Sequence, residues 1–172
     1  MQHTDPRPAP ALTSLSTADR PWRRWNLVGL TALTTYSAAV SWQAQQVSYP
    51  LYRKVGESDF AAYHQFYNGA IPLPVIVPGF ACFIAAAAFP WTRPQDVSRP
   101  VAAAVAVAGI VSLASTVLWA IPMHARLDSA GPSPATIDSL LSANLVRSAA
   151  LSVGAVTLTW CLGRLLSRTP NR

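Results

Sequence analysis

Charged residues are scarce in this chain, making up 12% of its 172 residues, and lysine occurs only once, as Lys54. Hydrophobic residues make up 51%, a balance typical of membrane proteins rather than of soluble domains. The net charge of +6 would suit a nucleic-acid binder, but the arginines flank apolar runs instead of forming one basic patch with interleaved aromatic residues. The composition therefore argues against nucleic acid as a partner and indicates the lipid bilayer.

Familiar catalytic and cofactor-binding motifs are missing as well. The sequence has no P-loop, no GxGxxG fingerprint, no nucleophile elbow and no HExxH. His64 and His124, the two histidines outside the N-terminal segment, lack the spacing of metal ligands. We therefore predict neither metal nor cofactor, with a site made of both histidines and Asp59 or Asp128 as a weaker alternative.

The chain has only two cysteines, and both fall inside apolar runs. Cys82 and Cys161 show no CxxC or secreted-type spacing, so we expect two reduced, buried thiols rather than a disulfide. The apolar runs also contain no Asp or Glu, which argues against an ion channel or a proton-driven pump.

The sequence does contain four long apolar runs. Each run is about 30 Å long as a helix, which is the thickness of the hydrocarbon core of a bilayer. The second run contains three prolines, Pro72, Pro74 and Pro78, which predict a kink near its start. The expected fold is all-α, an integral membrane four-helix bundle with spans at 26–47, 71–89, 101–121 and 145–165.

The arginines predict the orientation of these spans. In a four-span arrangement nine arginines lie on one side and four basic residues on the other, which puts both termini in the cytoplasm by the positive-inside rule. The protein is then a multi-pass protein of the plasma (inner) membrane, and its Arg-, Ala- and Pro-rich composition is typical of a GC-rich bacterial genome. We divide the chain into a disordered cytoplasmic tail (1–24), a transmembrane domain (25–166) and a second cytoplasmic tail (167–172).

Two connecting segments read as short amphipathic helices on the extracytoplasmic side. In the segment 57–70, Ser58 is a candidate cap, and Phe60, Tyr63, His64 and Tyr67 recur at helical spacing. The segment 131–144 offers Ser133 as a cap and Pro134 in the first turn. Each helix either lies on the bilayer surface or continues into the span that follows it.

Polar residues from different spans map to one extracytoplasmic rim. At 100° per residue, Gln43 and Gln46 share a sector of the first span, and Gln45 points nearly opposite. Polar groups at membrane depth are costly, so they usually face a bundle interior or a cavity. We therefore predict a site with His64 and Arg147 as catalytic residues and, as ligand-binding residues, Gln43, Gln46, Trp119, His124 and Asn144.

Each of these residues also has an ordinary structural interpretation. Trp42, Tyr49 and Trp119 fit an interfacial aromatic belt. Arg147 could extend to lipid headgroups, and the glutamines could join helices by hydrogen bonds worth about 1 kcal/mol or less. Their shared location, rather than any single residue, favours a site.

Four stretches carry a resemblance to known proteins: WQAQQVSYPLYRKV (42–55), FAAYH (60–64), PMHARL (122–127) and NLVR (144–147). They resemble a family of uncharacterised bacterial four-span membrane proteins and are more distantly similar to anthrone oxygenase-like membrane proteins. Anthrone oxygenases use O₂ to oxidise a phenolic polyketide without metal or flavin. In such a site His64 would act as the base, Arg147 as the anion partner, and Asn144, Gln43 and Gln46 as orienting amides.

Three functions remain open from the sequence. The rim binds a small amphiphile or a lipid headgroup, or the protein is an oxygenase-like enzyme acting on a phenolic substrate. The third possible function is that of a structural or accessory subunit, which docks a membrane partner or forms a homo-oligomer.

Overall fold

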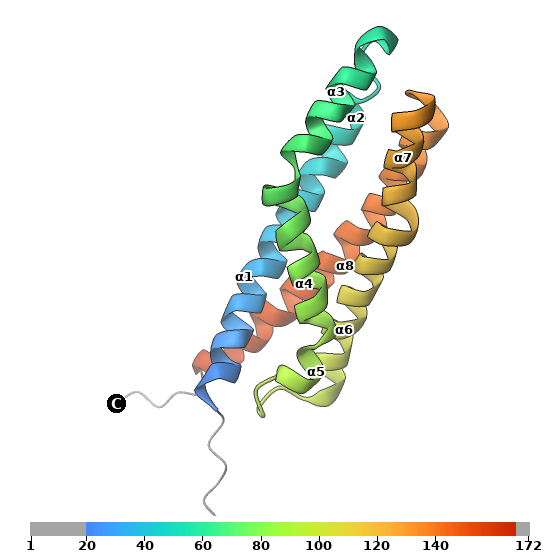
Figure 1. The fold of residues 1–172 in the computed structure, drawn as a ribbon. Helices are drawn as coiled ribbons and strands as arrows, with labels where there is room; N and C mark the ends of the chain where they lie inside the picture. Colours follow the sequence, from blue (N-terminus) through green and yellow to red (C-terminus); the bar gives the residue numbers. More distant parts are fainter. Residues whose placement is uncertain (1–19, 168–172) are drawn as a thin grey trace, which may run out of the picture.

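The structure, a computed structural model, describes residues 20–167, which form helices and no strand. These helices make four long rods that lie side by side (Figure 1). The prediction of an all-α fold is therefore confirmed. The predicted tails lie mainly outside the described residues, although the first helix already begins at Pro21, inside the tail that we assigned to 1–24.

Three of the four rods contain a π-helical segment, in which the turns are wider than in an α-helix. The first rod consists of α1 (Pro21–Gln43), η1 (Ala44–Ser48) and α2 (Tyr49–Leu51). The second consists of α3 (Glu57–Ala70), η2 (Pro72–Ile76), α4 (Val77–Ala87) and the short α5 (Phe89–Thr92). The third consists of α6 (Arg99–Ala114), η3 (Ser115–Ala120) and α7 (Ile121–Ala130), and the fourth is α8 (Pro134–Ser167) alone.

Successive rods run in opposite directions, so that both ends of the described chain lie at the same end of the bundle (Figure 1). Helix α8 packs against α1 and α6, and α4 packs against α1 and α6. Small residues bring the second and third rods very close together: a Cβ atom at Gly109 would lie 2.7 Å from the Ala86 Cβ and 2.9 Å from the Phe83 carbonyl oxygen. Small residues thus let these two rods pack closely at this contact.

The second rod is bent where its prolines begin. The axes of Glu57–Ala70 and Pro72–Ala87 differ by 51°, with the break at Ile71, so the predicted kink is confirmed. Pro78 has no N–H with which to reach the carbonyl of Pro74, four residues earlier. The Tyr36 hydroxyl donates to that carbonyl instead, at 2.8 Å, and so joins the first rod to the bend.

The two predicted connecting helices are both present, and both continue toward the following span. The first is α3, which begins after Gly56 without a side-chain cap, so the prediction of Ser58 as its cap is wrong. The second is the start of α8, which runs without interruption from Pro134 to Ser167. There the Ser133 hydroxyl accepts from the Thr136 N–H at 3.4 Å, which confirms the predicted cap.

Length and composition qualify some of these rods as membrane spans. Arg99–Ala130 and Pro134–Ser167 are long and apolar enough to cross a membrane, and the bent pair Glu57–Ala70 with Pro72–Ala87 would make a third. The first rod does not reach the same hydropathy, because threonines and serines recur along it. Several of these polar residues are buried inside the bundle, namely Thr31, Thr34, Ser37, Ser41 and Ser48.

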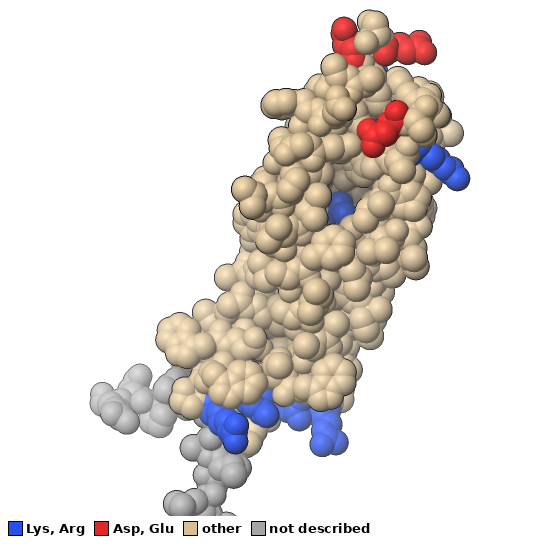
Figure 2. Space-filling view, viewed as in Figure 1, with Lys and Arg blue, Asp and Glu red and all other residues tan. Residues whose placement is uncertain are grey.

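Charge separates the two ends of the molecule (Figure 2). We call the end that carries the described chain ends the basic end, and the opposite one, where α2, α3 and α7 meet the start of α8, the far end. The basic end carries Arg20, Arg23, Arg24, Arg93, Arg99 and Arg164. The far end carries the acidic residues Glu57, Asp59, Asp128 and Asp138, together with Arg53, Lys54 and Arg126.

The core is divided along the bundle axis. One buried cluster, which includes Leu27, Phe89 and Leu158, fills the basic end. Another, built around Tyr52, Phe60 and Leu140, fills the far end. Cys82 and Cys161 are buried and unpaired, as predicted.

Candidate functional site

A cavity of about 340 Å³ lies among the four rods, on the side of the far end. The space-filling view shows its mouth as a hollow in the body of the bundle, with a basic group at the bottom (Figure 2). Every rod contributes to its lining, which is mostly apolar and includes Ile71, Phe80, Phe83, Ile121 and Leu151. Arg147 from α8 is the only arginine or lysine among the lining residues.

All three π-helical segments found in residues 20–167 border this cavity. Ala44 of η1, Val75 of η2 and Thr116 of η3 belong to its lining. A π-helical turn widens the helix locally and redirects the side chains that follow it, and such turns are frequent at functional sites. The coincidence of three such segments at one level marks the cavity as a built feature of the bundle.

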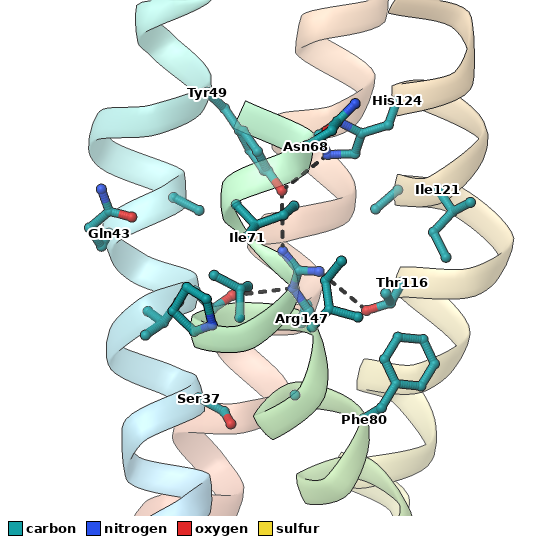
Figure 3. Close-up of a pocket in the computed structure, with 18 of the residues that line it drawn as sticks. Ser37, Gln43, Tyr49, Asn68, Ile71, Phe80, Thr116, Ile121, His124 and Arg147 are labelled. Carbon is teal, nitrogen blue, oxygen red and sulfur yellow. Dashed lines mark hydrogen bonds between the residues drawn. The ribbon is translucent and has the colours of Figure 1, made fainter. Parts of the chain in front are cut away.

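Arg147 projects from α8 toward the centre of the cavity (Figure 3). Its guanidinium donates to the Thr116 hydroxyl at 3.3 Å, to the Ser41 hydroxyl at 3.4 Å and to the Tyr49 hydroxyl at 3.5 Å, and it also donates to the Asn144 side-chain oxygen. All of these acceptors are neutral, and no ion pair found among the described residues includes Arg147. The site therefore holds a positive charge that no carboxylate contacts, since the one carboxylate of the lining, Asp128, bonds to His64.

Asn144 holds this arrangement from behind. It is fully buried, and its amide N–H₂ donates to the Ser41 carbonyl at 3.0 Å and to the Gln45 side-chain oxygen at 2.7 Å. With these bonds made, its own oxygen is left to accept from Arg147 and from the Ser41 hydroxyl. Ser41 also bonds to Ser148 at 2.7 Å, so α1 and α8 are joined by buried polar contacts. Such satisfied networks fix the orientation of the groups that they contain.

A second chain of polar groups leads from Arg147 to the far end. His64 Nδ1 lies 2.6 Å from Asp128 Oδ1, and His64 Nε2 lies 3.0 Å from His124 Nδ1. His124 Nε2 then lies 3.4 Å from the Tyr49 hydroxyl, which also contacts Arg147 (Figure 3). The His64 side chain is 1% exposed and that of Asp128 is 52% exposed, so the chain runs from the cavity to the molecular surface.

Aromatic rings surround the two histidines. Tyr52 contacts His64 edge-on with a centroid distance of 5.3 Å, and His64 stacks between Phe60 and His124 at 5.5 and 5.2 Å. Tyr52 is itself fully buried, and burial raises the pKa of its phenol far above the usual value. Tyr52 therefore stays protonated and serves as a wall of the histidine pair.

The structure brings most of the predicted site residues together, in two shells. His124 and Arg147 line the cavity, and Gln43 lies at its margin, where its amide bonds to Ser48 at 3.1 Å (Figure 3). His64 and Asn144 do not line it but contact His124 and Arg147 from behind.

Two predicted residues lie elsewhere. Gln46 is exposed and is not part of the lining. Trp119 is 39% exposed, and its indole N–H donates to the Ser139 hydroxyl at 2.8 Å, outside the cavity. The prediction that Gln43 and Gln46 face one pocket is therefore wrong for Gln46.

Sequence reasoning missed the roles of two contributors, Gln45 and Tyr49, and considered a third, Asp128, only for a metal site. Gln45 points to Asn144 rather than away from the site, because the side of the first rod that packs on α8 is the one that carries Ser41 and Gln45, four residues apart. Tyr49, which we interpreted as a belt residue, is 4% exposed and joins both polar chains. Asp128, which we grouped with the two histidines only as a weaker metal-site alternative, is the surface end of the histidine chain.

Within residues 20–167 no group of three or more His, Cys, Asp or Glu side chains is arranged to hold a metal ion. Comparison with known proteins finds no matching family model, no matching curated protein and no matching solved structure. The similarity to the uncharacterised four-span family and to anthrone oxygenase-like proteins stays a prediction.

Proposed function

We propose that the chain is a four-span protein of the bacterial inner membrane, with the basic end in the cytoplasm. In support, large side chains exposed along the rods are mostly apolar, such as Val28, Ile84, Val107 and Val156. The serines and threonines of the first rod lower its mean hydropathy. Several of them are buried, so they do not add to the outer surface of the rod. Exposed Trp22, Trp25, Trp91 and Trp160 near the basic end suit an interfacial belt.

Within that setting, we propose that the cavity binds a small amphiphile with an anionic head group. The observation that carries this is Arg147, a guanidinium that lines a mostly apolar cavity and contacts only neutral acceptors. A charge removed from water is costly unless it is paired. An anionic head group would supply the missing partner, and the guanidinium fork suits a carboxylate or a phosphate.

The apolar lining gives the rest of the ligand a place. Ile71, Phe80 and Ile121 surround the space in front of Arg147 (Figure 3). Exposed Leu73, Ile76 and Leu118 lie on η2 and η3, beside the lining residues of the same segments. A head group at Arg147 with its chain along these residues would satisfy both the charge and the apolar surface.

Binding of decanoate to the protein in lipid nanodiscs tests this proposal, with empty nanodiscs as the blank. Wild-type protein is expected to bind decanoate more tightly than decanol, because only decanoate pairs with Arg147. A hydrogen bond to a charged group contributes about 1.5–3 kcal/mol, so Arg147→Met should weaken decanoate binding by about tenfold or more.

Arg126→Met provides the matched control. Arg126 is an exposed arginine of α7 that does not line the cavity, and its replacement should leave decanoate affinity unchanged. Equal binding of decanoate and decanol, or equal losses in the two variants, would contradict an anion site at Arg147.

A second candidate is an enzyme that acts on a phenolic substrate. The observation that favours it is the pairing, at Tyr49, of a histidine chain with a guanidinium, since general acid–base chemistry and anion stabilisation need such groups. Consumption of anthrone and O₂ by wild-type nanodiscs, but not by Arg147→Met nanodiscs, would identify this function. If anthrone binds but is not consumed, the protein is a binding protein and not this enzyme.

A further inference from the structure

We infer that Asp128, His64, His124 and Tyr49 form a proton relay that takes a proton from a weakly acidic head group in the cavity and delivers it to the far-end surface. Tyr49 is then the residue that exchanges a proton with the ligand, and the two histidines conduct that proton. This inference rests on the proposed function, because it needs a ligand whose head group lies at Arg147.

The two ends of the chain fix the direction of every hydrogen bond in it. Arginine can only donate, so the Tyr49 oxygen accepts from Arg147 and its O–H is free to donate to His124 Nε2. With neutral rings, His124 then carries its proton on Nδ1 and donates to His64 Nε2. His64 carries its proton on Nδ1 and donates to the Asp128 carboxylate, which can only accept.

Each group thus already holds the proton that it would pass on. When a head group HA gives its proton to the Tyr49 oxygen, the former Tyr49 proton moves to His124 Nε2. The His124 Nδ1 proton moves to His64 Nε2, and the His64 Nδ1 proton moves to Asp128 and then to water. The products are a bound anion A⁻ beside Arg147 and one proton outside, and release of the ligand as HA reverses every step.

The geometry places the point of exchange at Tyr49. Its hydroxyl makes the two longest contacts of the chain, 3.4 Å to His124 and 3.5 Å to Arg147, and Tyr49 lines the cavity. The two contacts beyond His124 are shorter, at 3.0 and 2.6 Å, and lead through the buried His64, which does not line the cavity, to the half-exposed Asp128 at its margin. Catalytic hydrogen bonds are often long before the ligand is bound.

Burial explains why a relay of side chains is needed. An apolar ligand that fills the cavity displaces water between Arg147 and the surface, so a proton must leave through the protein. His64 is fully buried between Phe60 and His124, and Asp128 is about half exposed. The other titratable groups that face the two histidines are Tyr52, which stays protonated, and Tyr67, which stacks on His124.

The relay also narrows the class of ligand. A carboxylic acid, with a pKa near 4, is already ionised at pH 7 and needs only Arg147. A chain of proton-exchanging groups is useful for a head group that still carries its proton at neutral pH. We therefore assign to the cavity an amphiphile with a weakly acidic head group, bound as its anion.

Decanohydroxamic acid, a weak acid that is mostly protonated at pH 7, is the probe for this relay. Stopped-flow mixing of nanodiscs with the probe and a pH indicator measures how fast the proton appears in solution. Wild-type protein should release about one proton per hydroxamate and about none per decanoate. Tyr49→Phe should release the hydroxamate proton at least about tenfold more slowly than wild type, because the first proton acceptor is gone.

His64→Phe is the second variant, since it keeps a ring between Phe60 and His124 and does not alter the cavity lining. It should slow proton release to the same extent. Tyr63→Phe changes a nearby phenol that is in neither the chain nor the lining, and it should behave as wild type.

The outcomes separate the two proposals. If wild-type protein does not bind decanoate through Arg147, the proposed function fails. If decanoate binds but the hydroxamate releases no proton, or if His64→Phe protein that still binds decanoate releases the proton as fast as wild type does, the relay is refuted. Should Tyr49→Phe lose decanoate binding as well, His64→Phe alone decides.

Discussion

At the residue scale, the three glutamines of the first rod show what periodicity can and cannot assign. Counting 100° per residue correctly separated Gln45 from Gln43 and Gln46. It did not say which side of the rod would meet α8. Because Ser41 and Gln45 face α8, Gln45 bonds to the buried Asn144, and Gln46 is exposed. Helical sectors were predictable from sequence, whereas the neighbour of each sector depends on packing among all four rods.

Replacement of these two glutamines tests that assignment. Gln45→Ala removes the acceptor of one Asn144 N–H, and an unsatisfied buried donor costs about 1–3 kcal/mol. Gln46→Ala alters an exposed side chain and should change the free energy of unfolding by less than about 0.5 kcal/mol. Thermal unfolding of both variants in nanodiscs measures the difference. Equal melting temperatures would contradict the role of Gln45.

At the element scale, interruptions of the helices were partly readable. Three prolines predicted the bend of the second rod, because the chemistry of proline is local. The π-helical segments of the first and third rods contain no proline, but each ends two residues before one, Pro50 or Pro122, a signal that we did not interpret as a π-helical turn. They widen their rods at the cavity, which is a consequence of tertiary structure. The site was therefore predictable as a rim of polar residues, but not as a cavity.

The contact between α4 and α6 depends on Gly109. A methyl group there would approach the Ala86 side chain and the Phe83 backbone, and a backbone atom cannot rotate away. Gly109→Ala should lower the free energy of unfolding by about 1–3 kcal/mol, the usual cost of overpacking.

Gly29→Ala is the control for this contact. No atom lies within 4 Å of its Cβ position, so the alanine should be neutral or stabilise the helix by up to about 1 kcal/mol. In thermal unfolding, the melting temperature should fall for Gly109→Ala and should stay the same or rise for Gly29→Ala. Similar melting temperatures would show that the second and third rods can move apart without loss of stability.

At the scale of the whole molecule, the sequence predicted four antiparallel rods, and the structure has them, because apolar length is a strong signal. It did not predict that hydropathy alone would qualify only two or three of them as spans. The inward-facing threonines and serines of the first rod are responsible, since they contribute to its mean hydropathy but not to its outer surface. Whether the first rod inserts into the membrane therefore decides the number of spans.

Orientation in the membrane is the last prediction. Arg147, which we counted among the four extracytoplasmic basic residues, lies in the cavity, so Arg53, Lys54 and Arg126 remain at the far end against six described arginines at the basic end. The positive-inside rule then places the basic end in the cytoplasm. Green fluorescent protein fused after Arg172 should fluoresce, and alkaline phosphatase at the same position should be inactive. Alkaline phosphatase inserted at Gly131, between α7 and α8, should be active. If both reporters give the same side, an even number of spans separates residues 131 and 172 instead of α8 alone, and the four-span topology would be abandoned.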